Sequence, residues 1–242
     1  MIVKGEKRAT NGWGGRVNYT YSRLMDNQFG ETNFMQPNTA EALNAYDLTA
    51  EYSLGLIDVP HKLAFAPIVE LPFGRGKRWA ARGAAPALLA GWTISSVVTL
   101  ESGFPIAVAS ATNNTNLFTQ MQRPNPTGEV QPLADGDHES RLVGQWLDPN
   151  AYSVPMAFTL GTAPRTEGRV RGPHRNNVDM AVSKSGRLRG RLRSEFRVEA
   201  INLTNTVKVI GPIHTADSSG FGQIRTQSGF MRIVQFTFQM SF

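Results

Sequence analysis

The closing stretch FMRIVQFTFQMSF, residues 230–242, decides the fold, because its side chains alternate between apolar and polar types. Successive side chains of a β-strand point to opposite faces, so the stretch predicts a strand with one apolar and one polar face. A water-soluble sheet seldom ends a chain on such a strand with an aromatic residue on the apolar face. The apolar set is Phe230, Val234, Phe236, Phe238, Met240 and Phe242, and the polar set is Gln235, Thr237, Gln239 and Ser241.

The same two-faced pattern recurs upstream in stretches of about ten residues, the length that a tilted strand needs to cross a bilayer. The most polarised stretch alternates apolar residues with Arg193, Glu195, Arg197 and Glu199. An arginine facing lipid at the midplane costs about 2–4 kcal/mol, so this charged row predicts a watery or protein-filled interior. The sequence thus predicts about six membrane-spanning strands, at residues 13–22, 61–73, 92–101, 178–183, 192–200 and 230–242.

The connections between these strands alternate in length, which predicts their orientation. Outer-membrane barrels place short turns in the periplasm and long loops outside. With the last strand ending in the periplasm, every short connection falls there, and the aromatic residues at the two strand ends predict two interfacial girdles. The long connections are residues 24–59, 103–176 and 204–229, and the short ones are 74–89 and 185–191. The inner girdle would contain Phe73, Trp92 and Phe242, and the outer girdle Tyr19, Tyr21 and Phe230.

Composition limits the remaining possibilities. The chain has 242 residues, a net charge of +6 and no cysteine, which excludes disulfides and thiolate metal sites. Two basic stretches, GRGKRWAAR at 74–82 and KSGRLRGRLR at 184–193, are interpreted as solvated turns. The first residues lack a signal-peptide core, and six strands are too few for a single-chain barrel. We therefore expect a piece of a larger barrel.

Residues typical of catalysis or metal binding are scattered. The histidines, His61, His138, His174 and His214, show no metal-ligand spacing. The acidic stretch DGDHE at 135–139 is interpreted as a solvated loop rather than a calcium site. In GRGKR no Ser or Thr follows the lysine, so the stretch differs from a phosphate-binding loop. The sequence nominates no catalytic, cofactor-binding or metal-binding residue, and the substrate site is unknown.

Six stretches, in order, carry a resemblance that covers nearly the whole chain. They are DVPHKLAFAPIVELPFGRGKRW (58–79), GWTISSVVTLESGFPIAV (91–108), RPNPTG (123–128), GPHRNNVDMAVSKS (172–185), RSEFRVEAINLTN (193–205), and FGQI with the closing RIVQFTFQMSF. With these stretches the chain resembles the C-terminal β-barrel region of TonB-dependent outer-membrane receptors. The similarity is to the Oar-like type with a carboxypeptidase-regulatory-like N-terminal domain, common in Acidobacteria.

The resemblance implies an all-β antiparallel barrel of roughly 22 strands, of which residues 1–242 would form the C-terminal part. It implies uptake of a bulky ligand, with energy relayed by TonB through a plug domain in a full-length receptor. It also implies location in the outer membrane, contact with its lipid, and reading of Phe242 by the barrel-assembly machinery. No enzymatic activity, cofactor or nucleic-acid partner is expected.

Two other functions remain open at this stage. A self-contained passive outer-membrane channel requires a further hairpin, for which residues 115–158 are the available segment. A soluble basic β-protein that binds nucleic acid requires aromatic residues interleaved with cations on one strand face. In this sequence the aromatic and charged residues alternate onto opposite faces, which disfavours the second alternative.

Overall fold

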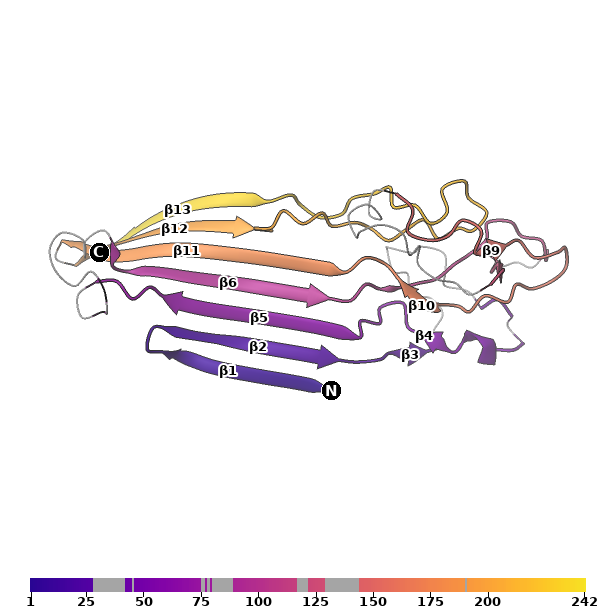
Figure 1. The fold of residues 1–242 in the computed structure, drawn as a ribbon, viewed down its shortest axis with the longest axis horizontal. Coiled ribbons are helices and arrows are strands. Elements are labelled where there is room, and N and C mark those ends of the chain that lie inside the picture. Colours follow the sequence, from indigo (N-terminus) through magenta and orange to yellow (C-terminus); the bar gives the residue numbers. More distant parts are fainter. Residues whose placement is uncertain are drawn as a thin grey trace.

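The computed structural model describes residues 1–27, 42–44, 46–74, 77, 79, 89–116, 122–128, 144–189 and 191–242. Its main feature is a seven-stranded antiparallel sheet whose spatial order follows the chain, β1-β2-β5-β6-β11-β12-β13 (Figure 1). Each strand therefore pairs with its sequence neighbour in the sheet, as in a barrel wall. The strands are β1 (Ile2–Thr10), β2 (Trp13–Tyr21), β5 (His61–Glu70), β6 (Trp92–Glu101), β11 (Arg175–Arg189), β12 (Leu192–Ile201) and β13 (Ile233–Ser241).

The long connections gather at one end of the sheet, opposite the end where the chain terminates (Figure 1). They contain only short elements within the described residues. No described helix combines the length and apolarity needed to span a membrane. The elements are β3 (Met25–Asp26), the 3-10 helix η1 (Thr49–Glu51), β4 (Ser53–Leu54), β7 (Pro105–Ile106), β8 (Asn125–Pro126), β9 (Tyr152–Ser153) and β10 (Glu167–Arg171).

The strand register places the alternating apolar residues on one face, which confirms the predicted all-β antiparallel fold. Val17 lies opposite Phe65, Phe65 opposite Val98, and Val98 opposite Val178, so one apolar row crosses four strands. A shift of one residue in any pairing would move that strand's apolar side chains to the other face. The apolar face is open, with Phe236 69% exposed, so it requires lipid or another apolar cover.

The sheet contains one strand more than the six that alternation predicts. Strand β1 escapes the pattern because Gly5 and Lys7 occupy its apolar face. Lys7 directs its ammonium group toward the turn between β1 and β2. Its Nζ donates a hydrogen bond to the Trp13 carbonyl at 2.8 Å and lies 3.7 Å from the centroid of the Trp13 ring. A lysine near a strand end can bury its stem in this way and keep its charge at the interface.

The β11–β12 hairpin corrects a second expectation, that residues 185–191 form a turn. Strand β11 continues to Arg189, so the connection to β12 is tight. Strand β6 pairs with β11 only as far as Lys184, which lies opposite Trp92. Beyond this point β11 pairs with β12 alone, so the hairpin extends past β6.

Candidate functional site

Charged residues on the polar face of the sheet form cross-strand ion pairs. Glu101 on β6 binds Lys62 on β5 at 2.6 Å and Arg175 on β11 on its other side. Arg16 on β2 binds Glu6 on β1 at 3.3 Å. Opposite charges facing each other across strands stabilise a sheet. These pairs neutralise much of the charge on the face predicted to line the barrel interior.

The row Arg193, Glu195, Arg197 and Glu199 lies on this polar face of β12, as its alternation predicts. Arg197 binds Glu199 at 2.5 Å along the same strand. Arg193 and Glu195 are exposed, and neither has an ion-pair partner among the described residues. The two charged side chains nearer the loop end of β12 therefore form an ion pair, whereas the two nearer the turn end form none in the described structure.

The long loops fold into a body with its own apolar core. The Trp146 indole donates a hydrogen bond to the Arg171 carbonyl at 2.8 Å. The Tyr152 ring meets the edge of Phe221 at a centroid distance of 5.8 Å and an interplanar angle of 90°. A packed core gives the loops a defined shape before a ligand binds. The core consists of Ile106, Val108, Trp146, Leu147, Tyr152, Ala163, Val170, Phe221 and Ile224.

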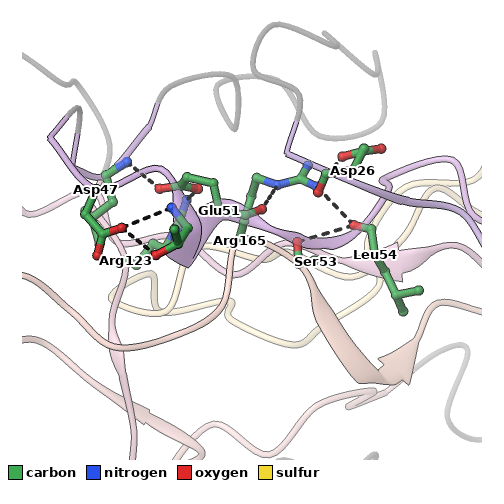
Figure 2. Close-up of polar contacts among 9 residues, drawn as sticks. Asp26, Asp47, Glu51, Ser53, Leu54, Arg123 and Arg165 are labelled. Atoms are coloured by element: carbon green, nitrogen blue, oxygen red, sulfur yellow. Dashed lines mark hydrogen bonds and ion pairs between the residues drawn. The ribbon is translucent and has the colours of Figure 1, made fainter.

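Buried arginines join the first long loop to the second (Figure 2). Arg165, 5% exposed, binds the Asp26 carboxylate. Its Nε donates to the Glu51 carbonyl at 3.0 Å, and its Nη2 donates to the Leu54 carbonyl at 3.3 Å. Arg123 in turn binds the fully buried Glu51 carboxylate. Such buried charges are tolerated because each is paired and hydrogen-bonded.

A partly buried arginine, Arg171, fixes the loop body to the ends of the strands through the buried Asp58. Arg171 binds Asp58 at 2.5 Å and also donates to the Gly103 carbonyl at 3.2 Å. The other oxygen of Asp58 accepts the backbone N–H of Leu24 at 2.6 Å. One arginine therefore connects the segments that follow β2, precede β5 and follow β6. This contact restricts how far the loops can move from the barrel wall.

Asp217 in the third long loop binds the start of the second. Thr112 donates to it through both its hydroxyl, at 2.6 Å, and its backbone N–H, at 2.8 Å. Ala111 N–H and the Ser110 hydroxyl add bonds of 2.9 and 3.0 Å. Partial burial opposes ionisation, but these hydrogen bonds outweigh it and hold the pKa of Asp217 below its ordinary value.

One loop tip exposes large apolar side chains on a constrained backbone. Met156 and Phe158 are 79% and 78% exposed. Phe158 has a φ of +61°, which is strained for a bulky residue, and its N–H donates to the Asn114 carbonyl at 2.7 Å. The Thr159 hydroxyl closes the turn onto the Met156 carbonyl at 2.6 Å. This tip therefore presents two large apolar side chains to the surroundings from a hydrogen-bonded turn of the loop body.

The scattered histidines do not converge within the part of the chain that the structure describes, where no metal-binding group of His and acidic residues occurs. His61 accepts or donates a 2.8 Å hydrogen bond with the Tyr19 hydroxyl and packs against Tyr21 at the loop end of the sheet. Burial lowers the pKa of His214 in the third loop. His138, the acidic stretch 135–139 and most of GRGKR lie outside the described residues.

Sequence reasoning did not identify the buried arginine contacts or the core of the loop body. Arg165 and Asp26 are separated by 139 positions, and neither belongs to a motif. The structure brings together residues from all three long loops at one end of the sheet (Figure 1). The arrangement offers a folded loop body at that end and a face of polar and charged groups along the sheet.

A family model described as an outer membrane beta barrel domain matches residues 1–235. No curated protein and no solved structure matches.

Proposed function

Because this chain belongs to the outer membrane beta barrel domain family and therefore lies in the outer membrane, we propose that it forms the C-terminal part of the barrel of a TonB-dependent receptor of the Oar-like type. In this proposal residues 1–242 are one portion of the barrel wall, and the complete receptor takes up a bulky ligand. TonB and a plug domain act only in that complete receptor. The chain performs no catalysis and binds no nucleic acid.

The observation that carries this proposal is the open sheet. In the described structure β1 and β13 each have one unpaired edge. Backbone groups left unpaired in lipid cost several kcal/mol each, so the edges require further strands. Seven strands with open edges fit a segment of a large barrel better than a small closed one.

The loop body supports uptake of a specific ligand rather than free passage. Its packed core and the buried contacts of Arg165 and Arg171 hold the three long loops in one arrangement. A preformed outer surface reduces the entropy lost when a ligand binds. The tip at Met156 and Phe158 would contribute apolar contact area to such a ligand.

The passive channel is the alternative, and its additional hairpin was expected within residues 115–158. Within the described part of that segment the strands are β8 and β9, which pair with each other over two residues each, and Gln122 and Gln145 form isolated bridges to residues outside the segment. A strand that crosses a bilayer needs roughly 9 to 11 residues, so strands of two residues are far too short to do so. This geometry favours the receptor proposal.

Conductance separates the two functions. The chain is refolded into liposomes, and heat-dependent gel mobility and single-channel currents are measured. The receptor proposal expects no reproducible monomeric conductance, because the two open edges cannot close a pore. A stable monomeric conductance would contradict it and favour the passive channel.

A further inference from the structure

Three arginines gather at the turn end of the β11–β12 hairpin, and we call Arg187, Arg191 and Arg193 the arginine cluster. Arg187 and Arg193 are direct partners across the two strands. Arg193 is also the partner of Ser241 on β13, which places this pair on the polar face of the sheet. Arg191 lies in the turn itself, and all three side chains are exposed.

At the arginine cluster the charges on the polar face do not balance. Elsewhere on that face Arg16, Lys62 and Arg175 are each paired with a glutamate. Within the described residues no carboxylate lies at ion-pair distance from Arg187 or Arg193. Like charges directly opposite each other destabilise a strand pair. An anionic partner at this position would relieve that repulsion.

The cluster borders two adjoining hollows that share Arg187, Arg193 and Ser241. The larger, of about 450 Å³, crosses β11, β12 and β13. Its lining adds the side chains of Ser185 and Gln239, which can donate hydrogen bonds, and the acceptor-only carboxylate of Glu195. The smaller is completed by Arg191 and Phe242. Guanidinium groups bind carboxylates through two parallel hydrogen bonds, so the lining suits an extended ligand with successive carboxylates.

We propose that the arginine cluster binds an acidic segment of polypeptide that enters the barrel from the periplasmic side. This inference rests on the proposed function, because only in a larger closed barrel does the polar face line an interior. Lipid headgroups are excluded from that interior, since the face that contacts lipid is the opposite one. A segment spread over three strands matches the two hollows better than a single small anion does.

The binding test uses a full-length receptor that contains residues 1–242, in uncharged detergent micelles, and a fluorescent peptide of alternating Glu and Ser residues. The same peptide with Gln in place of Glu is the uncharged control. The Arg187→Gln/Arg193→Gln double variant should bind the acidic peptide at least about tenfold more weakly, and binding should weaken with salt. The Arg187→Lys/Arg193→Lys variant should recover part of the affinity, because charge returns without the bidentate geometry.

Arg16→Gln is the matched control, because Arg16 lies on the same face and is paired with Glu6. It should leave peptide binding unchanged. Far-UV circular dichroism checks the strand content of each variant. Arg191 lies in the turn and pairs with no described residue of a neighbouring strand. Arg191→Gln should therefore lower the affinity for the acidic peptide, by less than the Arg187→Gln/Arg193→Gln double variant does.

Several results would overturn the proposal. These are absence of acidic-peptide binding, an equal loss in Arg16→Gln, or equally strong binding of the Gln peptide. Competition by inorganic phosphate at matched ionic strength would assign the hollow to a small anion instead. Greater affinity for phosphatidylglycerol vesicles than for the peptide would assign it to lipid. Conductance by the chain would contradict the receptor function independently of these binding results.

Discussion

Replacing Arg165 with methionine should open the loop body while leaving the barrel strands intact. Methionine fills much of the arginine volume but donates no hydrogen bond. The change leaves the Asp26 carboxylate without its buried partner and removes the donors to the Glu51 and Leu54 carbonyls. Breaking a buried ion pair from one side costs about 3–5 kcal/mol. The local opening equilibrium should therefore rise between about a hundredfold and a few thousandfold.

Amide hydrogen exchange measures this opening directly. The N–H of Gly55 donates to the Leu24 carbonyl at 3.0 Å within the affected segment, so its exchange should accelerate by that factor. Amides of β6 should exchange at the same rate as before. Arg16→Met is the control, because its ion pair with Glu6 is exposed and contributes little. Equal exchange at Gly55 in both variants would refute the proposed contribution of Arg165.

Three further predictions concern topology, acidity and assembly. In a full-length receptor, an impermeant maleimide on intact cells should label Ser219→Cys in the third loop and spare Ser185→Cys at the turn end; the reverse pattern contradicts the orientation. Because hydrogen bonding lowers the pKa of Asp217 despite partial burial, its ionised form stabilises the loop body at neutral pH, and this contribution is lost as pH falls through the folded-state pKa, below about 3.9. Asp217→Asn should therefore flatten the acid dependence of loop exchange, and an unchanged acid profile would show that other groups control it. We propose that Phe242 is read by the assembly machinery, so deletion of Phe242 should lower outer-membrane levels of the receptor more than Phe238→Ala does, although each change removes one apolar-face aromatic worth about 1.5–3 kcal/mol of burial; equal levels would contradict that role.

Alternation predicts the barrel wall from sequence because the two faces of each strand have different surroundings. Phe65 and Val98 could be assigned to one face from their parity alone, and their direct pairing in the sheet confirms it. Strand β1 was missed because Gly5 and Lys7 interrupt its apolar parity. Asn11 and Gly12 between β1 and β2 carried an available signal, since both adopt positive φ, as a tight hairpin turn requires.

The loop body could not be predicted in the same way. Its contacts join residues far apart in sequence, such as Arg165 with Asp26 and Ser110 with Asp217. No periodicity links such residues, because the loops are irregular and their packing is decided by tertiary fit. The strand pattern places these loops at one end of the sheet, whereas their mutual arrangement comes only from the structure.

We propose that one face of the sheet contacts lipid and that the other lines an interior. The chain has no cysteine, so single cysteines on the central strand β6 can carry spin labels without background from residues 1–242, in a receptor freed of any cysteine elsewhere. Ser96 and Val98 lie on the apolar face, whereas Ser95 and Val97 lie on the polar face. Ser96 is thus a polar residue on the apolar face and Val97 an apolar residue on the polar face, so these two positions distinguish the effect of the face from that of the residue type. In a full-length receptor in liposomes, labels at 96 and 98 should be relaxed by oxygen dissolved in lipid. Labels at 95 and 97 should lack that relaxation. The assignment of the two faces would be contradicted if relaxation followed the polarity of the native residue or were equal at all four positions.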